Sequence, residues 1–105
     1  MEKVMTLAST YPVLIFSTTT CCMCHVMKRL FIELGANLTI HELDENPNGK
    51  EMETALVKLL AGRSPPVPVV FIGGHLVGTM DEVMTLHLRG SLVPMIKDAA
   101  ELSRN

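Results

Sequence analysis

A run of four large apolar residues, Val13-Leu14-Ile15-Phe16, constrains the fold of this chain more than any other segment. The run has the length of a β-strand, and it is apolar at every position rather than at alternate positions. Such a strand is typical of the middle of a sheet, where both faces are covered. We therefore expect a buried central strand.

Three cysteines, Cys21, Cys22 and Cys24, follow this strand within four consecutive positions. A cluster this tight cannot link distant segments, which excludes a framework of structural disulfides. A polar turn over residues 17–20 separates the cysteines from the strand, and apolar residues recur at helical spacing beyond them until Gly35. The cysteines therefore lie where a buried strand ends and a helix begins.

The remaining segments alternate between helical and strand patterns. We expect helices over residues 2–8, 50–60, 81–89 and 91–102, strands over residues 38–43, 67–72 and 75–78, a loop over residues 44–49, and a hairpin turn at Gly73-Gly74. A strand–helix–strand unit requires a crossover and gives parallel pairing, whereas the hairpin is antiparallel. The sequence thus predicts a single α/β domain over residues 1–105, with a mixed four-stranded sheet and helices on both faces.

Charge and hydropathy exclude several classes of function. The net charge is -2 and charges of both signs are interspersed, so no basic stripe indicates direct binding to nucleic acid. No apolar run approaches the length of a membrane-spanning helix, and residues 1–4 do not begin a signal peptide. We expect a protein of the cytoplasm, and of the nucleus as a second location, that makes no contact with membranes.

The position of Cys21 favours redox chemistry. Unpaired amides and a partial positive charge at a helix N-terminus stabilise a thiolate, so the first sulfur of a Cys-x-x-Cys placed there is exposed and acidified. Cys24 lies about one turn further along the helix, close enough to attack a mixed disulfide formed at Cys21. The spacing predicts thiol–disulfide exchange or a metal site, and we favour the first.

Two other interpretations use the same cysteines. A ferredoxin-like copper carrier also has Cys-x-x-Cys between its first strand and first helix, but here a helix beginning at Lys50 precedes the hairpin, which is the wrong order. The run from Cys21 to His25 matches the pattern of covalent haem attachment, but the fold is not helical and no sign of export is visible. We expect no metal site formed by protein residues alone.

Pro68 is a second site residue that the pattern indicates. It opens the predicted third strand, where a missing backbone donor is tolerated. Facing a thiol pair, such a proline leaves the backbone edge open for an extended peptide or a tripeptide. The alternative is an ordinary proline at the start of a strand.

The chain resembles the glutaredoxins over nearly its whole length. The matching segments are residues 13–24, 66–68, 70–74, 78–81 and 87–94. The Cys21-Cys22 doublet is similar to that of the plant-specific CC-type members, which carry Cys-Cys-x-Cys or Cys-Cys-x-Ser. The resemblance implies a thioredoxin fold and a glutathione-dependent oxidoreductase that reduces glutathione mixed disulfides. Cys21 would then be the nucleophile that takes up glutathione, and Cys24 the resolving cysteine.

The resemblance also implies how the tripeptide is held. Val67 would pair its backbone with the cysteinyl segment of glutathione beside Pro68. The Met80 amide and Asp81 match the positions that hold the γ-glutamyl end. Asp81 is equally suited to be the N-cap of the helix that follows, and it could serve both purposes.

Two departures from the family pattern bear on rate and on partners. Ordinary glutaredoxins carry a lysine where this chain has Thr18, and its loss leaves the Cys21 thiolate less stabilised. CC-type members are linked to TGA-type bZIP transcription factors, and many end in an Ala-Leu-Trp-Leu-like tail, which residues 99–105 lack. Thr18 and the cysteine doublet leave a weakly catalytic regulator that binds such a factor as the alternative function, and the missing tail argues against the best-known form of that function.

Cys22 has no counterpart in ordinary glutaredoxins. We expect it to be a bystander, an alternative resolving thiol, or part of an iron–sulfur site, in that order. Some glutaredoxins bind a two-iron cluster between two protomers through the nucleophilic cysteine and glutathione. The partners that the resemblance implies are thus glutathione and glutathionylated proteins, with a TGA-type factor or an iron–sulfur cluster as alternatives.

Overall fold

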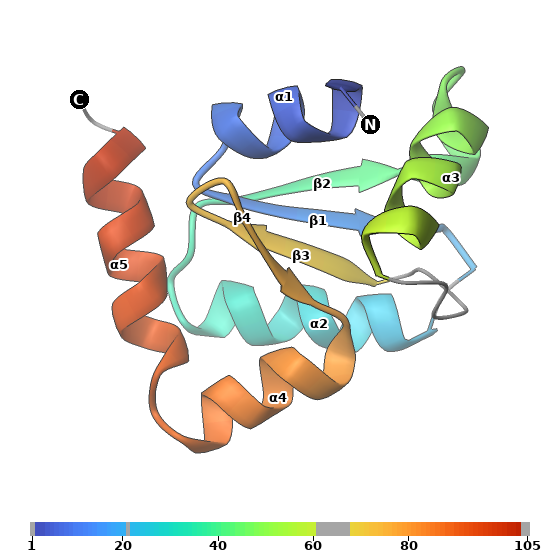
Figure 1. The fold of residues 1–105 in the computed structure, drawn as a ribbon. Coiled ribbons are helices and arrows are strands. Elements are labelled where there is room, and N and C mark those ends of the chain that lie inside the picture. The colour runs from blue at the N-terminus through green and yellow to red at the C-terminus, as the bar shows by residue number, and fades with distance from the viewer. Residues whose placement is uncertain (1, 21, 61–67, 104–105) are drawn as a thin grey trace.

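The computed structural model describes residues 2–20, 22–60 and 68–103 (Figure 1). The predicted order of helices and strands is confirmed, with one additional short 3-10 helix, η1. The elements are α1 (Glu2–Thr10), β1 (Val13–Ser17), α2 (Cys22–Glu33), β2 (Leu38–Glu42), η1 (Leu43–Glu45), α3 (Gly49–Leu59), β3 (Val69–Ile72), β4 (His75–Gly78), α4 (Met80–Leu88) and α5 (Leu92–Ser103).

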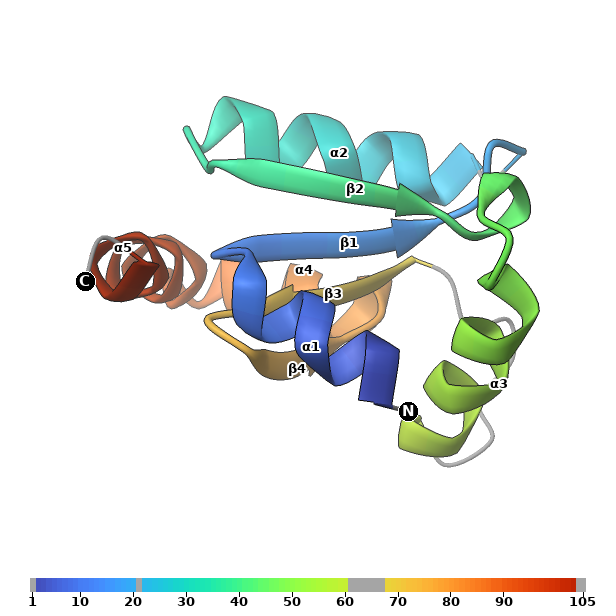
Figure 2. The same cartoon turned by 90° about the horizontal axis from the view of Figure 1, so that it is seen from above.

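The four strands form one mixed sheet in the order β2-β1-β3-β4, as predicted (Figure 2). β1 pairs in parallel with β2 and antiparallel with β3, and β3 pairs antiparallel with β4 through the hairpin. Gly73 and Gly74 turn this hairpin with φ angles of 60° and 83°, which residues with a side chain rarely adopt. All five residues of β1 are buried, so the prediction of a central strand is confirmed.

Helices cover both faces of the sheet, and Figure 1 shows α1 and α3 on one side and α2 and α4 on the other. Successive side chains of β1 alternate between two cores. Leu14 and Phe16 pack with residues of α1 and α3. Val13 and Ile15 pack with residues of α2, α4 and α5. Each large side chain buried in this way stabilises the fold by about 1.5–3 kcal/mol, which is why the elements around β1 are firmly placed.

Most predicted boundaries differ from the structure by one or two residues, and three of these differences lie at strand ends. Ser17 was expected in the turn, but it is the last residue of β1 and is fully buried. Leu43 begins η1 instead of ending β2, so part of the expected loop is helical. β3 begins at Val69, so Pro68 precedes the strand instead of opening it. Val67, the other residue predicted at this strand end, lies outside the described residues.

The N-cap of α4 is Thr79 and not Asp81, which corrects the prediction. The Glu82 carboxylate accepts hydrogen bonds from the Thr79 amide at 3.1 Å and from the Thr79 hydroxyl at 2.9 Å. This arrangement is a capping box, in which the residue three positions into the helix returns to the cap. Asp81 therefore lies in the first turn of α4, where its charge is favourable but closes no cap.

None of the helices in the described part of the chain is long and apolar enough to cross a membrane.

Gly49 allows α3 to start directly against the backbone of η1. A Cβ atom at this position would lie 1.8 Å from the carbonyl oxygen of Leu43. Helix propensity alone predicts that Gly49→Ala stabilises the protein by up to about 1 kcal/mol. The steric contact predicts the opposite, a loss of about 3 kcal/mol in the free energy of unfolding, at the upper end of the usual effect of overpacking. Urea denaturation measures the difference.

The matched control is Lys50→Ala, at the next and exposed position of the same helix. We expect a change within about 0.5 kcal/mol for this variant. A Gly49→Ala protein as stable as the Lys50→Ala protein would contradict the close approach of α3 and η1.

Candidate active site

The strands β1, β3 and β4 meet the first turns of α2 and α4 at one end of the sheet (Figure 1). β1 ends there and leads to the head of α2. β3 begins at the same end, because Val69 pairs with Phe16 near the end of β1. β4 also ends there, because Gly78 pairs with Val70 and is followed directly by α4. The fold thus brings Cys22, Pro68 and the head of α4 to the same end of the molecule.

The two cysteines that the structure describes differ in exposure. Cys22 is the first residue of α2 and is exposed, whereas Cys24 is fully buried. Cys21 lies outside the described residues, so its role as the nucleophile stays a prediction. Burial shields Cys24 from sulfur atoms in solution. The role of Cys24 as the resolving cysteine stays a prediction.

Pro68 is buried directly before β3. The antiparallel register that pairs Phe16 with Val69 continues to place Pro68 opposite Ser17, the last residue of β1. Pro68 therefore lies at the strand end from which the chain proceeds to the cysteines. The contacts of Pro68 and Val67 with a tripeptide stay predictions.

The head of α4 offers the two chemical groups predicted for ligand binding. Met80 is the first residue of the helix, and amides at this position have no partner within the helix. Asp81 is exposed, and among the described residues its carboxylate accepts no hydrogen bond. Because Thr79 and Glu82 form the cap, the Asp81 carboxylate is available to a ligand.

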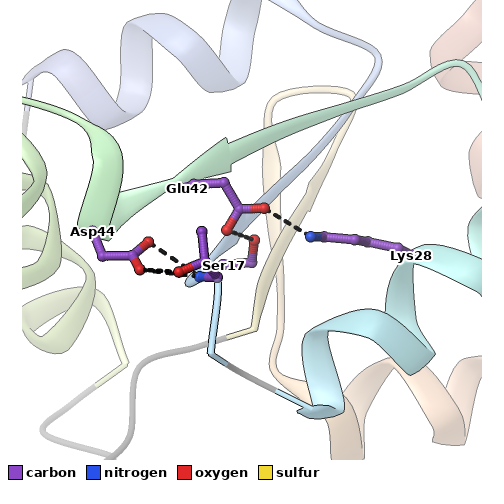
Figure 3. A network of polar contacts seen from close by, with 5 residues as sticks. Ser17, Lys28, Glu42 and Asp44 are labelled. Carbon is purple, nitrogen blue, oxygen red and sulfur yellow. Dashed lines mark hydrogen bonds and ion pairs between the residues drawn. The ribbon is translucent and has the colours of Figure 1, made fainter.

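A polar network, which we call the Ser17–Glu42–Lys28 network, lies between α2 and the ends of β1 and β2 (Figure 3). The Ser17 hydroxyl donates to Glu42 Oε2 at 3.0 Å, and Lys28 Nζ lies 2.7 Å from Glu42 Oε1. Sequence analysis did not single out these residues. The signal in the sequence that could have revealed this network is Ser17, a polar residue at the last position of a strand that is apolar everywhere else.

Asp44 holds the turn that leads to the cysteines (Figure 3). The Thr19 amide donates to both carboxylate oxygens of Asp44, at 3.1 and 3.2 Å, and the Thr19 hydroxyl also donates to Oδ2. The hydroxyl bond first, and then the amide bond, hold the pKa of Asp44 below its ordinary value, although desolvation opposes them. The turn before Cys21 is thus tied to η1.

Among the described residues, no group of three or more His, Cys, Asp or Glu could hold a metal ion. Cys21 lies outside that set, so a glutathione-ligated iron–sulfur cluster stays a prediction.

The stability contribution of Asp44 is expected to depend on pH. Its pKa is lower in the folded protein than the ordinary value of 3.8. The carboxylate therefore stabilises the fold fully above pH 3.8, and this contribution is lost as the pH falls through the folded pKa. We expect Asp44→Ala to lower the free energy of unfolding at neutral pH, and the difference from the native protein to shrink below about pH 4.

Urea denaturation at several pH values measures this effect. Glu45→Ala is the control, because Glu45 is exposed in the same 3-10 helix and its side chain makes no hydrogen bond among the described residues. The same pH dependence in both variants would refute the assignment to the Thr19–Asp44 contact.

The glutaredoxin family model matches residues 13–77 of the chain. A putative glutaredoxin-C14 of Oryza sativa subsp. japonica is 60% identical over 102 residues, covering 97% of this chain and 98% of the relative. Monothiol glutaredoxin-S8 of Arabidopsis thaliana is 57% identical over 97 residues, covering 92% of this chain and 93% of the relative. The similarity therefore extends over nearly the full length of both plant proteins.

Solved structures agree with this result. The buckwheat glutaredoxin–glutathione complex superimposes with a TM-score of 0.88 at 38% identity, covering 94% of this chain and 88% of that chain. The holo form of glutaredoxin C1 from Populus tremula x tremuloides gives 0.85 at 39% identity, covering 93% and 95%. These neighbours confirm the thioredoxin fold. The chain belongs to the glutaredoxin family, among its plant CC-type members, and is a thiol–disulfide oxidoreductase of that type.

Proposed function

We propose that this chain uses glutathione as its co-substrate and reduces glutathione mixed disulfides through Cys21. The observation that supports the proposal is that three features lie at one end of the sheet: the head of α2 with Cys22, buried Pro68 and the head of α4. The buckwheat glutaredoxin, which is similar along 94% of this chain, was solved as a complex with glutathione.

The chemistry of the head of α4 suits the γ-glutamyl end of glutathione. That end carries a carboxylate and an ammonium group on one carbon. The Met80 amide at the helix N-terminus can donate to the carboxylate, where the helix dipole adds a favourable field. The exposed carboxylate of Asp81 can accept from the ammonium group. The carboxylate of the γ-glutamyl end therefore meets a hydrogen-bond donor, and its ammonium group meets an acceptor of opposite charge.

The reaction proceeds by two thiol–disulfide exchanges. The Cys21 thiolate attacks the glutathione sulfur of a mixed disulfide, the protein substrate leaves as a thiolate, and Cys21 is joined to glutathione. A second glutathione then attacks the glutathione sulfur of this adduct, which frees the Cys21 thiolate and forms oxidised glutathione. In the alternative route Cys24 attacks the Cys21 sulfur, reduced glutathione leaves, and further glutathione reduces the Cys21–Cys24 disulfide. The electrons that reduce the substrate come from glutathione, which leaves as its disulfide.

Intact-mass measurement of the Cys24→Ser protein after incubation with oxidised glutathione tests the first exchange. We expect one glutathione adduct, mapped to Cys21 by peptide analysis. Cys22 is exposed at the head of the same helix, so the Cys21→Ser/Cys24→Ser protein is the matched control and should take up none. An adduct on Cys22 alone, or no adduct at neutral pH, would overturn the proposal.

Asp81→Asn separates ligand binding from helix capping. Since Thr79 and Glu82 form the cap, we expect this change to leave the melting temperature almost unaltered while raising KM for a glutathionylated substrate several-fold. Thr79→Ala should leave KM almost unaltered and lower the free energy of unfolding by about 1 kcal/mol. An Asp81→Asn protein with native KM would remove Asp81 from the binding site.

We also propose that the protein acts in the cytoplasm and the nucleus on glutathionylated proteins. The absence of a basic stripe in the sequence supports a protein substrate over nucleic acid. The binding of a TGA-type bZIP factor and of an iron–sulfur cluster stay predictions, because no feature of the described residues favours either over glutathione chemistry.

A further inference from the structure

The side of the sheet that faces α2 changes from apolar to polar at its last position. In β1, Val13 and Ile15 belong to the core under α2. Ser17 continues the same face and is paired in register with Glu42, the last residue of β2. Lys28 reaches this pair from α2 (Figure 3). The ends of two strands and one helix therefore share a single polar network near the cysteine run.

This network is largely shielded from water. Ser17 is fully buried, and the side chains of Lys28 and Glu42 are only 16% and 21% exposed. Removing two charges from water costs much of what their attraction returns, so apolar residues of similar volume could fill such a place equally well. The stability of the fold alone therefore does not explain a charged pair here.

Lys28 lies four residues after Cys24 in α2, and the two side chains consequently share one face of the helix. Helical side chains lean toward the N-terminus, so the Lys28 stem leans toward the turn that carries Cys24, and its ammonium group meets Glu42 at the end of β2. Cys24 is fully buried, which disfavours its thiolate. A positive charge held nearby in a poorly solvated place opposes this effect.

We propose that Lys28 is a positioning residue that acts through Cys24. Its ammonium group, fixed by Glu42 and Ser17, favours the Cys24 thiolate in the resolving exchange. This inference rests on the proposed role of Cys24 as the resolving cysteine. It adds a part of the site that lies outside the cysteine run itself.

The step balances as follows. Cys24 gives its proton to water, and its thiolate attacks the Cys21 sulfur of the Cys21–glutathione disulfide. The bond between Cys21 and glutathione breaks, and a Cys21–Cys24 disulfide forms. Glutathione leaves as a thiolate and takes up a proton from water. Two further glutathione molecules then reduce the protein disulfide and leave as oxidised glutathione.

The other ionisable groups around Cys24 act in known directions. Glu42 opposes Lys28, because a negative charge disfavours a thiolate. Cys22 and His25 belong to the same helix but are exposed, and Asp81 is exposed at the head of α4. β1 and β3 contain no charged residue. The other basic residues of α2, His25 and Arg29, are exposed, so Lys28 is the cation on the buried side of this helix.

The test uses the Cys21→Ser/Cys22→Ser protein, in which Cys24 is the only cysteine. The ultraviolet absorbance of its thiolate, followed against pH, gives the pKa of Cys24. We expect Lys28→Met to raise this pKa by about 1, and Lys28→Arg to keep it near the native value. Glu42→Gln retains an oxygen that accepts from Ser17 and Lys28 but removes the negative charge, so it should lower the pKa.

The decisive result is that the two variants, Lys28→Met and Glu42→Gln, shift the pKa of Cys24 in opposite directions. A merely structural network would be weakened by both Lys28→Met and Glu42→Gln, and the pKa of Cys24 would then move in the same direction in both. That outcome, or no change in either variant, would overturn the proposal. This titration needs no glutathione, so it gives a result even if the proposed function fails.

A kinetic measurement connects Lys28 to the reaction. In protein with native cysteines, we expect Lys28→Met to slow the release of glutathione from the Cys21 mixed disulfide roughly threefold, because fewer thiolates are partly offset by a more nucleophilic sulfur. In the Cys24→Ser protein, where external glutathione resolves the adduct, Lys28→Met should have no effect. Equal slowing in both backgrounds would show that Lys28 does not act through Cys24.

Discussion

All five residues of β1 are buried, and the need to cover both faces of this strand places every other element. Leu14 and Phe16 require α1 and α3 on one side, and Val13 and Ile15 require α2 and its neighbours on the other. Since β1 also pairs with β2 and β3, it has no free edge. α2 is the next element after β1, so its head is placed by a strand that is buried at every position.

The site begins where this burial ends. Ser17 still lies in the strand but already forms hydrogen bonds, and Thr19 two residues later is tied to Asp44. The first contact reaches the last residue of β2 and the second reaches η1, so the short path from β1 to the cysteines is fixed on one side by these two elements. A redox-active thiol needs such support, because the geometry of its exchange partners decides the rate.

Three polar residues at the head of α4 separate helix capping from the role assigned to Asp81. Thr79 and Glu82 satisfy the helix terminus, and the Asp81 carboxylate stays exposed for another partner. Glu42 and Lys28 show a similar division, because one side chain fixes the position of the other. In both places the part of the arrangement that stabilises structure is distinct from the part assigned to chemistry.

The sequence by itself determined the central strand, the strand-to-helix position of the cysteines and the Gly73-Gly74 hairpin, because apolar periodicity and glycine turns act over a few neighbouring residues. It also contains the capping box in Thr79-Met80-Asp81-Glu82, although the residue predicted as the cap is Asp81. Only the tertiary structure decided that Ser17 meets Glu42 and Thr19 meets Asp44, each 25 residues apart. Such contacts depend on strand register and on the packing of α2, which no local pattern encodes.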